Sequence, residues 1–237
     1  MWDPQWRTFP HSHRVLRYDM RGFGRSPIGP GRYSHARDLL ELLGMYGLDG
    51  VSLVGVSMGG RVALEVALAH PQLVTALVLV GSGLPGHSWS REMNEADEEE
   101  EAALRRGDIE AAVEVSLRTW VDGPRRGPED VDPAVRASVA EMQRRAHELQ
   151  LPVIDTAEEE SLVPDLLDRL GEIRARTLVV VGREDLPDIH AIADRLAREI
   201  PGARRATIAD AAHVPSLERP AEFDELVLTF LAENGRP

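Results

Sequence analysis

A single serine stands among glycines in the stretch VSLVGVSMGGR, residues 51–61. Gly55, Ser57 and Gly59 form the pattern G-x-S-x-G between two apolar segments, which are typical of a buried strand and a buried helix. In such a turn the serine occupies a strained apex, and glycines two positions away let strand and helix approach. We therefore predict that Ser57 is a nucleophile at the carboxyl end of a strand. The N–H of Met58, at the positive end of the helix, is the predicted oxyanion donor.

A serine hydroxyl needs a general base, and that base needs a carboxylate to orient it. In folds built around this turn, the acid and then the histidine follow the serine along the chain. His213 lies just past the last predicted strand and before the final helix. The acid candidates Glu184, Asp185 and Asp188 follow another buried strand, whose carboxyl end faces the same rim as Ser57. We predict Asp185 as the acid and Asp188 as the cap of the next helix.

The amino-acid composition excludes several classes of catalytic and binding site. The 237-residue chain has no cysteine, and all 27 of its basic residues are arginine. This excludes thiol nucleophiles, thiolate metal sites, Schiff-base lysines and P-loop lysines. We expect neither a metal ion nor a cofactor. A net charge of −13 argues against nucleic-acid binding, and a small molecule is the expected partner. We find no apolar run of membrane-spanning length and no signal peptide, which together predict a cytoplasmic protein without membrane contact.

Strand and helix patterns alternate on both sides of a helix-rich middle. Apolar strands separated by helices predict a parallel sheet covered on both faces, with strands at 14–19, 51–56, 74–81, 176–182 and 203–210. Residues 84–172 show helical patterns and no convincing strand. They predict a helical cap inserted between two parts of an α/β core, 1–83 and 173–237.

Four stretches resemble the α/β-hydrolase superfamily: YDMRGFGRS, LVGVSMGGRVALEVALAHP, VVVGREDLPD and HVPSLERPAEF. Within it, the chain is most similar to the small-cap branch of enol-lactonase-like, ester and carbon–carbon bond hydrolases. The resemblance implies an α/β-hydrolase fold, a Ser57–His213–Asp185 triad, an acyl-enzyme and a substrate pocket between core and cap. Haloalkane dehalogenases and epoxide hydrolases of this fold carry aspartate where this chain has Ser57. The residues expected to line the pocket are Trp120, Met142 and Val214.

The N-terminal part departs from the family pattern. The family's second oxyanion donor follows an early strand and is usually marked by a His-Gly pair, which this sequence does not contain. Trp2, Trp6 and Phe9 instead have the spacing of one helix face. We expect an N-terminally truncated sheet with half of its oxyanion hole missing, and an open edge beside 14–19 that favours homo-oligomers. Two alternatives stay open: a non-catalytic or poorly active hydrolase-like protein, and a cofactor-free haloperoxidase-like enzyme.

Overall fold

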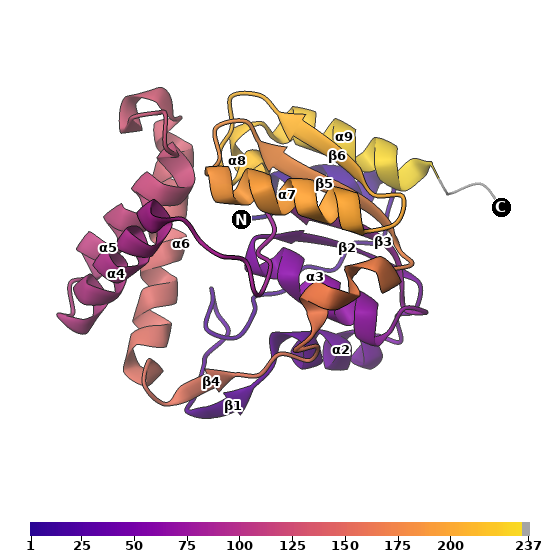
Figure 1. Ribbon diagram of the computed structural model, residues 1–237, viewed down its shortest axis with the longest axis horizontal. Coiled ribbons are helices and arrows are strands. Elements are labelled where there is room, and N and C mark those ends of the chain that lie inside the picture. Colours follow the sequence, from indigo (N-terminus) through magenta and orange to yellow (C-terminus); the bar gives the residue numbers. More distant parts are fainter. Residues whose placement is uncertain (234–237) are drawn as a thin grey trace.

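A parallel sheet forms the centre of the computed structural model, which describes residues 1–233 (Figure 1). Its strand order is β2-β3-β5-β6, with β2 at Val51–Val56, β3 at Val74–Val80, β5 at Arg176–Gly182 and β6 at Arg204–Ile208. All three pairings are parallel. Strands β3 and β5 consist largely of buried valine and leucine, as expected for strands covered on both faces. The predicted parallel sheet is confirmed.

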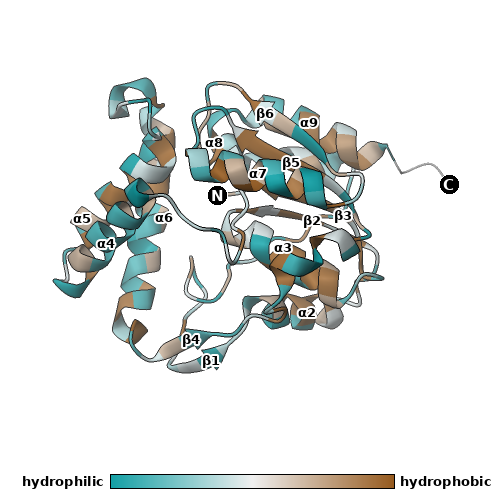
Figure 2. Cartoon of the chain, viewed as in Figure 1, coloured by the Kyte–Doolittle hydropathy of each residue, from teal (hydrophilic) through white to brown (hydrophobic). Residues whose placement is uncertain are grey.

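Helices cover the two faces of the sheet with separate apolar clusters. On one face, Leu77 and Val179 pack with α2 (His35–Met45), α3 (Met58–Ala69), α7 (Pro187–Glu199) and the 3₁₀ helix η5 (Leu166–Glu172). On the other face, Val78 and Val180 pack with Phe9 and with α9 (Pro220–Ala232). Alternate strand residues thus supply opposite clusters. In Figure 2, brown, apolar residues appear on the strands of the sheet and on parts of the helices that cover it.

The N-terminal segment is helical, as the spacing of its aromatic residues predicted. It forms α1 (Asp3–Thr8) and the 3₁₀ helix η1 (Phe9–His11), and Phe9 is buried while Trp6 is 43% exposed. The buried Gln5 amide donates hydrogen bonds to the Ser216 carbonyl at 3.1 Å and to Asp224 Oδ1 at 2.8 Å. These bonds attach α1 to the C-terminal helices, which the aromatic pattern did not indicate.

The predicted strand at 14–19 is wrong. These residues carry an apolar alternation, but they pair with no strand in the described part of the chain, and Leu16 and Tyr18 are exposed. A strand requires a neighbour for its backbone hydrogen bonds, and a sequence pattern cannot show whether that neighbour is present. Among residues 1–233 the edge of the sheet on this side is β2, so the open edge was also misplaced.

Two short strands escaped the sequence analysis. β1 (Gly31–Tyr33) and β4 (Ala157–Glu159) form a separate parallel pair, with Arg32 opposite Glu158. Strand β4 lies within 84–172, where no strand was expected. Its sequence, AEE, has no apolar run or β-branched residue, so only the backbone pairing reveals it.

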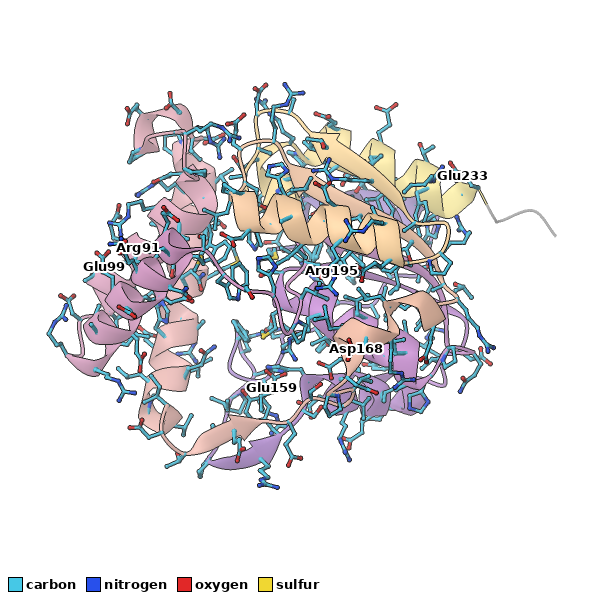
Figure 3. The ribbon with its side chains drawn as sticks, viewed as in Figure 1. Arg91, Glu99, Glu159, Asp168, Arg195 and Glu233 are labelled. Atoms are coloured by element: carbon cyan, nitrogen blue, oxygen red, sulfur yellow. The ribbon has the colours of Figure 1, made fainter. Side chains whose placement is uncertain are left out.

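The helices of the segment predicted to be a cap, called the cap from here on, lie beside the part of the chain that contains the sheet (Figure 1). They are α4 (Arg91–Arg105), α5 (Ile109–Ser116), the short π-helix η2 (Leu117–Asp122) and α6 (Pro133–Gln150). Short 3₁₀ helices η3 (Pro128–Asp130) and η4 (Leu151–Val153) complete this region, and Arg91 and Glu99 lie on α4, apart from the sheet (Figure 3).

Beyond the cap helices the chain returns to the core, where Leu166 and Leu170 of η5 belong to the same apolar cluster as Leu77 and Val179 of the sheet. Residues before 172 thus already pack in the core, and the boundaries of the cap at 84 and 172 stay a prediction. No helix among residues 1–233 is long and apolar enough to cross a membrane.

Candidate active site

Ser57 occupies a strained turn between β2 and α3. Its backbone φ is +54° and its ψ is −116°, a conformation that residues other than glycine rarely adopt. A side chain at Gly55 would overlap the Gly59 carbonyl and come within 2.6 Å of the Gly60 nitrogen. The chain therefore needs glycine at position 55 so that the strand and the helix can meet this closely, and the result is a serine held at the apex of the turn.

Backbone hydrogen bonds fix this turn at the carboxyl end of β3. The Ser57 N–H donates to the Val80 carbonyl at 2.9 Å, and the Ser57 carbonyl accepts from the N–H of Gly60 and of Gly83, both at 3.0 Å. Met58 is the first residue of α3, so its N–H has no partner within the helix and lies at the positive end of the helix dipole. Met58 is thus suited to the predicted role of oxyanion donor, which stays a prediction.

The histidine and acid chosen from the sequence are hydrogen-bonded to each other. His213 Nδ1 lies 3.0 Å from Asp185 Oδ2 and 3.2 Å from Oδ1, and the exposed fractions of the two residues are 5% and 1%. Asp185 follows β5, and its Oδ1 also accepts the Leu186 N–H at 2.9 Å. The second ring nitrogen of His213, Nε2, is buried and has no hydrogen-bond partner among the described residues. This pair has the geometry of an oriented base with an open acceptor nitrogen.

Gly81 connects the serine turn to the histidine–aspartate pair. It directly follows Val80, whose carbonyl holds the Ser57 N–H, and its own φ is +47°. A methyl group on Gly81 would lie 2.9 Å from His213 Nδ1 and 3.3 Å from Asp185 Oδ2. The three sequence-predicted residues are therefore gathered at one end of the sheet, with the backbone of Gly81 as their common neighbour.

Residues 1–220 match the model of a protein family whose description is "alpha/beta hydrolase fold". The chain belongs to this family. It is 32% identical over 225 residues to a 2-hydroxy-6-oxononadienedioate/2-hydroxy-6-oxononatrienedioate hydrolase of Klebsiella pneumoniae, covering 93% of this chain and 77% of that protein. It is 30% identical over 239 residues to "Putative carbamate hydrolase RutD" of Rhizobium rhizogenes, covering 97% and 87%. The crystal structure of the enol-lactonase from Burkholderia xenovorans has a TM-score of 0.75 at 26% identity, covering 98% and 85%.

These comparisons confirm the fold class and the family inferred from the sequence, and they show that the chain is an α/β-hydrolase enzyme. The comparisons do not assign individual roles to Ser57, Asp185 and His213.

The close contact of Gly81 with the acid–base pair leads to a first prediction. Replacing Gly81 by alanine should lower kcat of the hydrolase by about 10²-fold, since a displacement of about 1 Å has that cost. Gly50→Ala is the matched control, because Gly50 also has a positive φ (+62°) but only the Thr75 methyl group nearby, at 3.7 Å. Steady-state kinetics and thermal unfolding of both variants test this. Equal losses of kcat in the two variants would contradict the prediction, because they would show that backbone strain alone, and not contact with His213 and Asp185, lowers kcat.

Asp188 does not cap its own helix, contrary to the prediction. The N-cap of α7 is Leu186, and Asp188 lies in the first turn, where its Oδ1 accepts the Ser90 N–H at 2.9 Å and lies 3.1 Å from His87 Nε2. Burial alone would raise the pKa of Asp188, but the hydrogen bonds from Ser90 and His87 outweigh it and hold this pKa below its ordinary value. Asp188 therefore ties the core to the start of the cap. The partner segment is remote in sequence, which is why helix-capping rules missed it.

The three predicted pocket residues lie at different distances from the acid–base pair. The Trp120 ring is 4.5 Å from the His213 ring between centroids, and the Trp120 carbonyl accepts the His213 N–H at 3.1 Å. Val214 is buried in the apolar cluster of the cap, and Met142 of α6 packs against that cluster. The structure thus brings Trp120 to the site. A role for all three in lining a substrate pocket stays a prediction.

A polar cavity of about 390 Å³ lies between the cap and the core, and Ser57, Asp185 and His213 are not among the residues that line it. Its lining consists of charged side chains: Arg126, Asp130, Glu184, Asp210 and Arg219. No cluster of three or more histidine, aspartate or glutamate side chains within residues 1–233 could hold a metal ion. Sequence reasoning gave no role to Arg126 or to its ion-pair partner Glu218, because no local pattern links them.

Proposed function

We propose that this hydrolase acts on a small ester, lactone or related acyl substrate through an acyl-enzyme on Ser57. The observation that carries the proposal is the buried contact of 3.0 Å between His213 Nδ1 and Asp185, next to the strained Ser57 turn. A hydroxyl, an oriented imidazole and a buried carboxylate at one end of a sheet form the constellation of nucleophilic acyl transfer.

The steps follow from which atoms are available. The Ser57 oxygen attacks the substrate carbonyl carbon, and its proton passes to Nε2 of His213. The negative charge that develops on the carbonyl oxygen is stabilised by the Met58 N–H, and Asp185 stabilises the imidazolium. The imidazolium then protonates the departing alkoxide, which leaves as an alcohol. His213 then deprotonates a water molecule, which attacks the ester on Ser57. The imidazolium returns this proton to the Ser57 oxygen as the acid is released.

The names of the relatives support an acyl-type substrate in general terms. They describe a "Putative carbamate hydrolase", a hydrolase of 2-hydroxy-6-oxononadienedioate and 2-hydroxy-6-oxononatrienedioate, and an enol-lactonase. Each of these reactions can proceed by attack on a carbonyl carbon. Apolar side chains beside His213, from Trp120 and Val214, favour a substrate whose acyl part is at least partly apolar.

An acylation experiment tests the proposal. The protein is mixed with p-nitrophenyl acetate, quenched in acid after milliseconds to seconds, and analysed by mass spectrometry of the intact chain and its peptides. We expect one acetyl group per chain, located on the peptide that contains Ser57, and release of an equal amount of p-nitrophenolate. A panel of esters, lactones and thioesters then defines the preferred substrate.

Two results would contradict the proposal. One is ester turnover in which no acyl group is trapped on Ser57 at any time point. The other is halogenation that depends on peroxide and halide in a protein without ester turnover, which would favour the haloperoxidase-like alternative.

A further inference from the structure

The loop that carries His213 is held by the cap as well as by the core. The backbone N–H of His213 donates to the Trp120 carbonyl of η2 at 3.1 Å. The Trp120 ring lies against the imidazole, with an angle of 42° between the two planes. Asp185 fixes the ring from the core side, and the π-helix η2 fixes the backbone from the cap side. The position of the base therefore depends on where the cap holds this short helix.

Arg126 joins the end of η2 to a carboxylate of the core. Its guanidinium donates to the carbonyls of Val121 at 2.6 Å and Asp122 at 2.9 Å. The same guanidinium lies 2.8 Å from Glu218 Oε2, on the short helix α8 (Pro215–Glu218) that follows His213. The side chains of Arg126 and Glu218 are only 12% and 5% exposed, so solvent weakens this ion pair little.

The second oxygen of Glu218 holds the residue next to the base. Oε1 of Glu218 accepts the Ala212 N–H at 2.7 Å, and Ala212 immediately precedes His213. A closed circuit of hydrogen bonds results: it runs from the Trp120 carbonyl through His213, Ala212 and Glu218 to Arg126, and back to η2. Each member of the circuit has a partner. A shift of η2 would therefore reach the backbone of His213 by two routes, through its own N–H and through the N–H of Ala212.

Direct packing reinforces this circuit. Gly123, the residue after η2, lies so close to the core that a side chain there would overlap the Glu184 carbonyl and come within 3.4 Å of the Ala212 methyl group. Glu184 precedes the predicted acid, and Ala212 precedes the base. The cap backbone thus touches both loops of the acid–base pair at one point. Figure 1 shows the cap beside the end of the core that contains α8.

The charge of Arg126 also matters for Glu218. Burial raises the pKa of Glu218, and the nearby Asp185 adds to this, whereas the Ala212 N–H and Arg126 act in the opposite direction. Arg126 therefore favours the ionised, acceptor-only form of a carboxylate that must hold a backbone N–H.

We propose that Arg126 and Glu218 are positioning residues that couple the cap to His213. The inference rests on the proposed function, in which His213 is the general base. Neither residue touches the reacting atoms; both act through the backbone of residues 212–213. Productive alignment of the base then requires the cap to be seated on the core, so catalysis and cap position are linked.

Kinetics of three variants test this inference: Arg126→Gln, Glu218→Gln and the double variant. With p-nitrophenyl acetate we expect kcat of Arg126→Gln to fall by about 10²-fold, with KM within about threefold of the wild type, because alignment rather than binding is lost. A single variant leaves one buried charge unpaired, whereas the double variant leaves none. We therefore expect the double variant to fold even if a single variant is destabilised. Arg145→Gln is the matched control. Arg145 is also a cap arginine that contacts the core, at the Gly24 carbonyl (3.1 Å), but away from His213.

A spectroscopic readout makes the test independent of turnover. The His213 Nδ1 proton, hydrogen-bonded to the buried Asp185, should give a downfield proton NMR signal in the wild type and in Arg145→Gln. We expect this signal to shift or broaden in Arg126→Gln and in the double variant.

The outcomes separate the two proposals. Folded variants with wild-type kcat and an unchanged His213 signal would overturn the coupling, and so would loss of the folded state in all three variants, which would assign the pair to stability alone. Absence of acylation on Ser57 in the wild type would overturn the proposed function. In that case the NMR signal still decides whether Arg126 and Glu218 position His213.

Discussion

Replacing Ser57 by alanine is expected to lower the single-turnover rate with p-nitrophenyl acetate by roughly 10⁶-fold, the cost known for loss of a serine nucleophile. Among residues 1–233, Ser57 is the only hydroxyl-bearing residue with a positive φ, and it stands alone at the apex of the turn between β2 and α3. Alanine carries the same strain as serine at this φ, so the fold should be retained. Labelling by a fluorophosphonate probe, measured as mass added per chain, should fall from one equivalent to none.

Ser52→Ala serves as the matched control for this experiment. Ser52 lies on the same strand, β2, and its side chain is exposed. We expect its rate to stay within about twofold of the wild type, since it touches no residue of the site. Stoichiometric labelling that persists in Ser57→Ala would show that another residue is the nucleophile. Reactivity of the probe should also fall strongly in His213→Ala, because the hydroxyl loses its base.

The parts of the site that could be predicted from sequence depend on short-range patterns. The turn at Ser57 requires glycines at fixed positions between a strand and a helix, and all of these are adjacent in the chain. Asp185 and His213 each follow a buried strand, and parallel strands place their carboxyl ends at the same edge of the sheet. Local signals and a topological rule therefore sufficed to bring three distant residues together.

The parts that could not be predicted depend on partners elsewhere in the chain. Residues 14–19 have the composition of a strand, but whether a strand forms is decided by a neighbour. Asp188 has the residue type and position of a helix cap, but its carboxylate accepts a hydrogen bond from the N–H of Ser90 instead of one from its own helix. Arg126 and Glu218 follow no motif at all. The absence of the second oxyanion donor and self-association through an open sheet edge both stay predictions.

Replacing Asp185 by asparagine is expected to lower kcat by about 10⁴-fold, the effect known for the equivalent change in a serine protease. The structure gives the reason in this chain. Oδ1 accepts the Leu186 N–H, so the amide oxygen of asparagine should stay there and its NH₂ group should occupy the site of Oδ2, 3.0 Å from His213 Nδ1. Nδ1 must then accept a hydrogen bond, and the imidazole proton moves to Nε2. A histidine in that tautomer cannot take the proton of Ser57.

The variant Asp188→Asn, compared with Asp185→Asn, tests which of the two carboxylates is the acid that orients His213. Asp188 is also a buried carboxylate and lies in the first turn of α7, shortly after Asp185, but it contacts Ser90 and His87 rather than the base. We expect kcat to change by less than about tenfold, with the main effect a lower melting temperature, because a hydrogen bond between core and cap is weakened. Circular dichroism melts and ester kinetics of both variants distinguish the two roles. A large loss of kcat in Asp188→Asn together with near wild-type kcat in Asp185→Asn would mean that the acid of this hydrolase was wrongly assigned, and that the contact between Asp185 and His213 serves packing only.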